Sequence, residues 1–419
     1  MSPRPSSTVG RRVAEAPKAV DTRHIAWLLA ALSAIGPFSI DAYLPSFHDM
    51  ADKLGASQLE VQQTLSSYLL AFAVMTLWHG AIADHFGRRR VILAALALFA
   101  LASAGCMAAT SIEQLWLWRA MQGVTAGAGI VISRAIVRDL FDGAAAQRLM
   151  AQITMMFAIA PAAAPVIGGW LQTLFGWRMV FAFLALMTAA LLFACWRWLP
   201  ETLPPESRQP MQPAYLARTY RRVLTSPFFL FACAALSFNF GGFFIYVLSA
   251  PVFLMRHLNL PETAFLWLFG PAMSGLLCGS SLSGWLAGRR SPYQTIAIGY
   301  GFMAAAALLN LAINLALPPG LPWSILPLFV YTTGVSVAMP SLTLLALDPF
   351  PAQRGLAASC QTFLQSAFNG LVAALIAPLL WDTTLHLALG MTGLMLLGGL
   401  AALAQRRVRG AAEKVHSPG

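Results

Sequence analysis

Apolar segments of about 20 residues recur along the whole chain, and this recurrence constrains the fold more than any other feature. A helix needs about 20 apolar residues to cross a bilayer, and charged, proline, glycine and serine clusters separate twelve segments of that length. They cover residues 25–45, 61–83, 91–110, 113–138, 147–172, 177–199, 227–250, 264–288, 293–317, 321–347, 356–381 and 384–404. Lipid offers the backbone no hydrogen-bond partners, so each segment must satisfy its own peptide groups as a helix. The sequence therefore predicts an all-α polytopic membrane protein with twelve transmembrane helices.

Composition excludes an ordinary soluble enzyme. Of the 419 residues, 58% are hydrophobic and only 10% are charged, whereas a soluble domain carries roughly 25% charged residues. The net charge of +11 comes from basic residues placed between apolar segments, which is typical of membrane loops and does not indicate a nucleic-acid partner. The five cysteines lie within apolar segments without a CxxC spacing, so we expect packing roles and no metal or disulfide framework.

A polar interruption at residues 200–226 divides the chain into two halves. It is rich in proline and arginine and leaves six predicted helices on either side. A short internal repeat supports duplication, because Gly80-Ala-Ile-Ala-Asp84 follows the second helix and Gly284-Trp-Leu-Ala-Gly288 follows the eighth. We therefore predict two pseudo-symmetric six-helix bundles. The predicted divisions are an N-terminal tail (1–24), a first bundle (25–199), a linker (200–226), a second bundle (227–404) and a C-terminal tail (405–419).

The distribution of basic residues predicts the orientation. With both termini in the cytoplasm, 23 of the 27 Lys and Arg residues lie on the inner side or at inner helix ends. Only Lys53, Arg178 and Arg256 then lie outside, and Arg119 lies within a span. The positive-inside rule therefore favours an orientation in which both termini and the linker lie in the cytoplasm.

Two ionisable residues within spans are the candidate proton-coupling site. A charge inside a membrane helix costs about 2.5–3.5 kcal/mol on insertion scales, so it is a functional hypothesis by default. Asp41 in the first helix and Arg119 in the fourth lie at similar depths, and they would pair if these helices are neighbours. The balance between desolvation and a nearby guanidinium can bring such a carboxylate's titration into the physiological range. The alternatives are an interfacial carboxylate that ends a helix for Asp41 and a packing or snorkelling role for Arg119.

Charged residues also gather at the inner ends of helices 2, 3 and 4. We predict that they form a network that locks one conformation and releases in another, with simple determination of topology as the alternative. Its expected members are Asp84, Arg88, Arg89, Arg134, Arg138 and Asp139.

Small residues and polar residues within the spans suggest helix packing and a substrate cavity. The expected packing or hinge residues, which let helices approach closely or bend, are Gly80, Gly87, Gly123, Gly127, Pro165, Gly168 and Gly169. An apolar cavity with few polar anchors suits drug-like ligands. Its expected lining, with core packing as the alternative for each, is Phe38, Tyr43, Tyr68, Gln122, Asn239, Phe240, Tyr246, Gln361, Gln365 and Asn369. We expect His79 to have a packing role.

Motifs that are absent from the sequence narrow the energy source. There is no GxxxxGK[ST] loop for ATP and no HExxH or CxxC metal motif. We therefore expect a protein that is not an enzyme, needs no cofactor or metal and takes its energy from an ion or substrate gradient.

Several of these motifs resemble the twelve-helix drug–proton antiporters of the major facilitator superfamily, and most of all the Bcr/CflA branch associated with bicyclomycin and chloramphenicol resistance. Gly80-Ala-Ile-Ala-Asp84-His-Phe-Gly87-Arg88-Arg89-Arg90 resembles the signature loop between helices 2 and 3. Arg119-Ala-Met-Gln122-Gly123 is similar to the helix 4 motif whose arginine is implicated in proton coupling. The stretches Ser39–Pro45, Arg134–Asp139 and Pro200–Leu203 also resemble this branch. The antiporter motif on helix 5 departs from the family pattern, with Ala160 and Ala164 in place of its first two glycines, whereas Pro165, Gly168 and Gly169 are kept.

The resemblance implies proton-coupled drug efflux across the bacterial inner membrane by alternating access. Helices 1, 4, 7 and 10 would line one central cavity, Asp41 would exchange a proton and Arg119 would modulate it. The implied partners are a small drug-like substrate, protons and the lipid bilayer, with a monomer as the expected functional unit. The alternatives are an exporter of a sugar or amino acid on the same fold and, more remotely, a membrane receptor or scaffold without transport activity.

Overall fold

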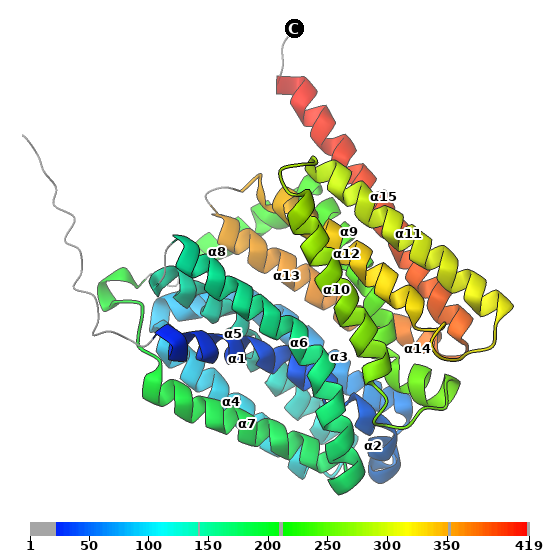
Figure 1. Ribbon diagram of the computed structural model, residues 1–419. Helices are drawn as coiled ribbons and strands as arrows, with labels where there is room; N and C mark the ends of the chain where they lie inside the picture. Colours follow the sequence, from blue (N-terminus) through cyan, green and yellow to red (C-terminus); the bar gives the residue numbers. More distant parts are fainter. Residues whose placement is uncertain (1–21, 141–142, 209–212, 351–352, 417–419) are drawn as a thin grey trace, which may run out of the picture.

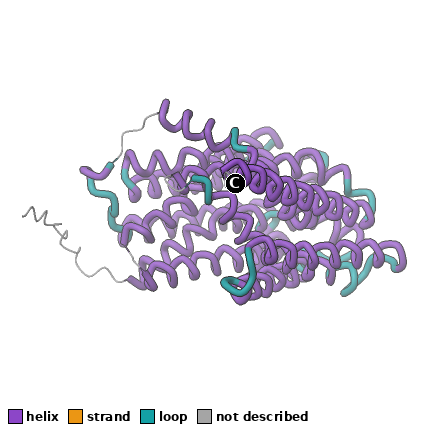
Figure 2. Tube along the Cα trace, turned by 90° about the horizontal axis from the view of Figure 1, so that it is seen from above, coloured by secondary structure: helices purple, strands orange, loops and turns teal. Residues whose placement is uncertain are grey.

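The computed structural model describes residues 22–140, 143–208, 213–350 and 353–416. Every regular element formed by these residues is a helix (Figure 2). The first half contains α1 (Thr22–Asp41), η1 (Leu44–Ser46), α2 (Phe47–Leu54), α3 (Gln58–Phe86), α4 (Arg88–Ala108), α5 (Ile112–Leu140), α6 (Gly143–Phe175) and α7 (Trp177–Trp198). The linker forms η2 (Pro205–Ser207) and α8 (Pro213–Leu224). The second half contains α9 (Pro227–Leu248), η3 (Val252–His257), α10 (Leu266–Leu286), α11 (Pro292–Ala316), α12 (Leu326–Leu347), α13 (Arg354–Leu371), η5 (Val372–Ile376), α14 (Ala377–Leu379) and α15 (Thr384–His416).

The long helices form two bundles that lie side by side (Figure 1). One bundle holds α1 and α3–α7, and the other holds α9–α13 and α15, so the predicted twelve-helix fold in two halves is confirmed. We call the end of the molecule that carries α8 the α8 end, and the opposite end, which carries α2 and α14, the α2 end. Within the described residues, ten helical segments are long and apolar enough to cross a membrane.

Several helix boundaries differ from the prediction. The first span ends as an α-helix at Asp41 and continues through η1 into α2. The eleventh span contains the π-helical turn η5, and the last helix continues through His416, so that most of the expected tail is helical. The residues after 404 include three Arg and two Ala, which have high helix propensity and extend α15 beyond its apolar part.

The linker also contains a helix that connects the two halves. On α8, Leu216, Tyr220 and Val223 recur at helical spacing and are buried in a cluster with Phe229 and Phe350 of the second half. The α3 residues Leu77, Trp78 and Ala81 pack against the same cluster. The Tyr220 hydroxyl donates a hydrogen bond to the Leu77 carbonyl oxygen at 2.5 Å. Burial raises the pKa of Tyr220 to about 12, so this hydroxyl stays protonated at pH values where an exposed tyrosine ionises.

Candidate functional site

A fully buried arginine is the centre of the candidate coupling site. Arg119 lies on α5 and is 0% exposed. Its Nη1 donates hydrogen bonds to the Ser39 carbonyl oxygen of α1 at 3.2 Å and to Gln122 Oε1 at 2.7 Å. The guanidinium also lies 4.2 Å from the centre of the Tyr43 ring and 4.5 Å from that of the Tyr68 ring. Two aromatic faces and two neutral oxygens therefore stabilise this cation in place of a carboxylate.

Hydrogen bonds hold the two tyrosines in position. The Tyr43 and Thr64 hydroxyls lie 3.0 Å apart. The Ser39 hydroxyl donates to the Tyr68 hydroxyl oxygen at 2.9 Å, and Tyr68 in turn donates to the Gly36 carbonyl oxygen at 3.3 Å. Gln122 Nε2 donates to the Ser103 hydroxyl oxygen of α4 at 2.7 Å. Four helices, α1, α3, α4 and α5, thus supply one connected polar cluster in the first half.

Asp41 lies close to this cluster in the sequence but does not pair with Arg119. It is the last residue of α1 and only 4% exposed. Among the described residues, its Oδ1 has no hydrogen-bond partner, and the same holds for Nε and Nη2 of Arg119. Asp41 and Arg119 were predicted to pair if their helices are neighbours. The helices are neighbours, since Arg119 contacts Ser39, two residues from Asp41, but the two side chains do not form an ion pair. A buried carboxylate oxygen without a partner makes the charged form costly, so Asp41 is a group that can accept a proton.

Close helix contacts fix the surroundings of Asp41. A Cβ added at Gly168 of α6 would collide with the carbonyl oxygen of Ala42. At the neighbouring Gly169, a Cβ would lie 2.5 Å from the Glu262 carbonyl oxygen in the second half. Gly168 and Gly169 thus pack α6 against the end of α1 and against the loop before α10, at the α2 end.

The α5 glycines Gly123 and Gly127 lie at close contacts between helices. A Cβ at Gly123 would collide with the Tyr68 carbonyl oxygen of α3, and one at Gly127 would lie 3.1 Å from the His79 ring. His79 itself is 3% exposed, and its Nε2 lies 3.0 Å from the Val124 carbonyl oxygen. A Cβ added at Gly80 would make only an ordinary contact with the Val131 side chain, at 3.9 Å. Pro165 on α6 is buried.

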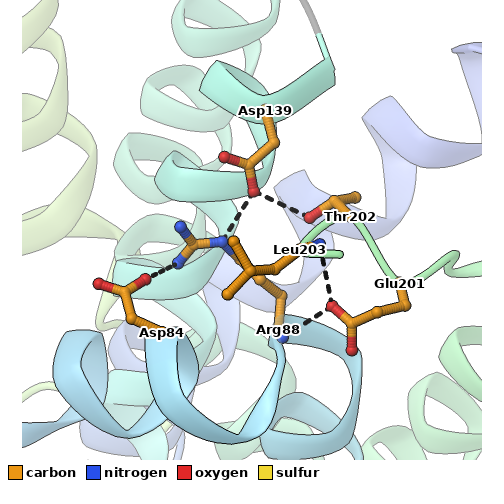
Figure 3. Close-up of polar contacts among 6 residues, drawn as sticks. All are labelled: Asp84, Arg88, Asp139, Glu201, Thr202 and Leu203. Atoms are coloured by element: carbon orange, nitrogen blue, oxygen red, sulfur yellow. Dashed lines mark hydrogen bonds and ion pairs between the residues drawn. The ribbon is translucent and has the colours of Figure 1, made fainter. Parts of the chain in front are cut away.

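A second polar cluster lies at the α8 end, where Arg88 links three segments (Figure 3). Its Nη1 lies 2.9 Å from Asp84 Oδ1, and its Nε donates to Asp139 Oδ2 at 2.7 Å. The backbone N–H of Arg88 donates to Glu201 Oε1 at 2.9 Å, and the Thr202 hydroxyl donates to Asp139 Oδ2 at 2.9 Å. The ends of α3 and α5, the start of α4 and the segment after α7 are therefore held together.

The structure adds residues to the predicted network, and it directs Arg89 away from it. Gly87 has a φ of 101°, and its missing side chain leaves room for the Glu201 carboxylate, since a Cβ there would lie 2.5 Å from Glu201 Oε2. Arg89 points elsewhere and donates to the Trp196 carbonyl oxygen at 2.6 Å. Arg134 is exposed on α5, and the Arg138 side chain lies outside the described residues. Glu201 and Thr202 were part of the Pro200–Leu203 resemblance, but the sequence did not show that they join this cluster.

The Arg88→Gln variant is expected to transport about tenfold more slowly while substrate affinity changes little. Removing the guanidinium leaves Asp84 and Asp139 without their shared cation, and a barrier change of about 1.4 kcal/mol corresponds to tenfold in rate. Initial transport rates across a range of substrate concentrations measure both quantities. Arg90→Gln is the matched control, because Arg90 is exposed and outside the contacts described. Equal rates for Arg88→Gln and the wild type would reduce this cluster to a determinant of topology.

Several residues predicted to line a central cavity face the interior of their own bundle. Asn239 donates to the Tyr300 hydroxyl at 2.8 Å, and Tyr246 accepts from Asn310 Nδ2 at 2.7 Å, so both contact α11. A polar group in an apolar interior is costly without a hydrogen bond, and the nearest partners lie within the second bundle. Tyr43, Tyr68 and Gln122 likewise belong to the Arg119 cluster.

The remaining predicted lining residues are more varied. The ring of Phe38 packs against Phe183 at 5.9 Å, and that of Phe240 against Phe244 at 5.6 Å. Gln361 Nε2 donates to the Thr343 hydroxyl oxygen at 3.3 Å. Gln365 is half-buried, and Asn369 is 8% exposed with its Oδ1 lacking a partner among the described residues.

Comparisons with known proteins agree with this architecture. A family model described as the Major Facilitator Superfamily matches residues 26–374. The chain is 28% identical over 377 residues to multidrug resistance protein D of Escherichia coli, covering 88% of this chain and 93% of that protein. It is 33% identical over 244 residues to the bicyclomycin resistance protein homolog of Haemophilus influenzae, covering 58% and 61% of the two chains. The crystal structure of a D-xylose–proton symporter superposes with a TM-score of 0.73 at 15% identity, covering 92% of this chain and 97% of that one.

Proposed function

Because the chain belongs to the major facilitator superfamily of membrane transporters, we propose that it exports drug-like molecules across the bacterial inner membrane in exchange for protons. The similarity to multidrug and bicyclomycin resistance proteins supports the substrate class. The two-bundle fold supports alternating access, in which the halves expose a shared site first to one side and then to the other. The proposed functional unit is one chain, since the Arg119 cluster and the Arg88 cluster are each formed by residues of the same chain.

The observation that carries the proposal is the buried Asp41 carboxylate, whose Oδ1 has no partner among the described residues. With cytoplasmic termini, the α8 end faces the cytoplasm and the α2 end faces the periplasm. A proton that enters from the periplasm neutralises Asp41, and it leaves to the cytoplasm as substrate binds. Arg119, fixed by α1 and α3, supplies a permanent positive charge that modulates this exchange. No cofactor or metal takes part, and the proton gradient supplies the energy.

Two structural features support alternation between states. The α6 contact of Gly169 with Glu262 brings the halves together at the α2 end, and α8 with the Arg88 cluster holds segments together at the α8 end. A transported molecule shifts the balance between the two states by its differential affinity for them.

Proton release from acid-loaded inverted vesicles tests the proposal. We expect chloramphenicol or bicyclomycin, added to the outside of vesicles that contain the protein, to release protons from the lumen, as reported by a pH-sensitive dye. Vesicles from cells that lack the protein are the control. No release across the drug panel, with insertion verified, would contradict drug–proton exchange and favour export of a metabolite.

A further inference from the structure

A cavity of about 340 Å³ lies at the α2 end, between the two halves. The first half contributes Phe47 and His48 of α2 and Gln62 of α3, and the second contributes Arg256 of η3 and Trp381. Ligand sites in proteins span roughly 300–1,000 Å³ and are mostly apolar with a few polar groups. This cavity has the size and the mixed lining of such a site, and its Phe47 ring packs against Tyr43 of the Arg119 cluster with the ring centres 5.1 Å apart.

The polar groups of the cavity are incompletely satisfied. Gln62 is 0% exposed, and neither its Nε2 nor its Oε1 has a hydrogen-bond partner among the described residues. A buried amide without partners is costly. Since Gln62 is 0% exposed, a ligand in the cavity recovers part of that cost only when this side chain turns towards it.

Arg256 carries the permanent charge among the residues that line the cavity. Arg256 has no ion pair or hydrogen bond within the described part of the chain. His48, the other ionisable lining residue, lies 3.6 Å from Asp52 on the exposed face of α2. The guanidinium of Arg256 is thus available to an anionic group, which it binds through charge-assisted hydrogen bonds.

We infer that this cavity binds a small amphipathic organic anion, with its anionic group at Arg256 and its aromatic or apolar body against Phe47 and Trp381. Since both halves line the cavity, such a ligand binds best while the halves meet at the α2 end, and it stabilises that arrangement. The site is therefore a second ligand site, where an anion added from the periplasm slows the transport cycle.

Isothermal titration calorimetry of the protein in lipid nanodiscs tests the site, with naphthalene-2-sulfonate as the probe. We expect saturable binding by the wild type and affinity at least about tenfold weaker in Arg256→Gln, the equivalent of losing one charge-assisted contact. Lys53→Gln is the matched control, because it removes a positive charge from an exposed residue at the same end and should leave the affinity unchanged. The neutral probe naphthalene-2-sulfonamide should bind the wild type and Arg256→Gln alike.

Each alternative result is decisive. Absence of saturable binding by the wild type, equal affinity in Arg256→Gln, or an equal loss in Lys53→Gln would overturn the proposal. Arg256 is exposed and has no described partner, so Arg256→Gln should fold normally, and its thermal unfolding verifies this. The titration needs no proton gradient, so its outcome is independent of whether the protein exchanges drugs for protons.

Discussion

The Asp41→Asn variant is expected to lose proton-driven efflux by roughly 100-fold, within the range of measured coupling free energies of 1–3 kcal/mol. The amide has nearly the shape of the carboxylate but cannot release a proton, so drug binding and proton movement become uncoupled. Downhill drug movement through the variant should persist. Proton release and drug accumulation in the same inverted vesicles measure the two activities separately.

Stability distinguishes this effect from misfolding. Because Asp41 is buried and its Oδ1 lacks a partner, replacing its charge with an amide should leave the thermal unfolding temperature unchanged or raise it. Asp52→Asn is the control, since Asp52 follows on α2, its side chain is 68% exposed and it lies 3.6 Å from the exposed His48. Surface pairs of this kind contribute about 0–1 kcal/mol, so Asp52→Asn should transport normally. Full proton-driven activity in Asp41→Asn would remove Asp41 from the coupling mechanism.

The Gly168→Val variant is expected to lose most transport, at least about tenfold, and to unfold at lower temperature. Its Cβ would collide with the backbone carbonyl of Ala42, which cannot rotate away as a side chain can. α6 must then move away from the end of α1, at a cost of about 1–3 kcal/mol for an overpacked contact. The shift displaces Ala42 and with it the adjacent Asp41.

Gly284→Val is the control for the size of the substitution. Gly284 lies within α10, and nothing lies within 4 Å of a Cβ added there. The added side chain should therefore change transport and thermal unfolding little. If Gly168→Val kept wild-type transport and stability, α6 could move away from the end of α1 without loss of either. This contact would then not position Asp41.

Much of the fold could be predicted from the sequence, because the bilayer imposes a length and a polarity on every span. The twelve apolar segments and the division near residue 200 correspond to the two helix bundles. The helix α8 was not predicted, because a linker rich in Pro and Arg is typical of a solvent-exposed segment without regular structure. The spacing of Leu216, Tyr220 and Val223 would have indicated an amphipathic helix, but the partners that bury it come from distant segments.

The candidate site was less predictable, because residue depth follows from sequence whereas helix rotation does not. Counting residues placed Asp41 and Arg119 at similar depth, but it could not show that Tyr43 and Tyr68 would cover the guanidinium. Asn239 and Tyr246 have polar side chains that would suit a cavity, but the rotation of α9 directs both towards α11. At the α8 end, Asp84, Arg88 and Asp139 were predicted together because charges at helix ends meet whatever the rotation of each helix.

The neutral surroundings of Arg119 bear on which drug charges the transporter can handle. Its hydrogen-bond acceptors are neutral, and an arginine stays protonated at any physiological pH. In the proposed cycle, the region is close to electrically neutral while Asp41 is ionised, and it carries a net positive charge once Asp41 is protonated. A cationic drug is then repelled at the moment the proton arrives, whereas an uncharged drug experiences little change. In that cycle, electrostatic repulsion would assist the release of cations, whereas neutral molecules such as chloramphenicol would depend on the change in cavity shape.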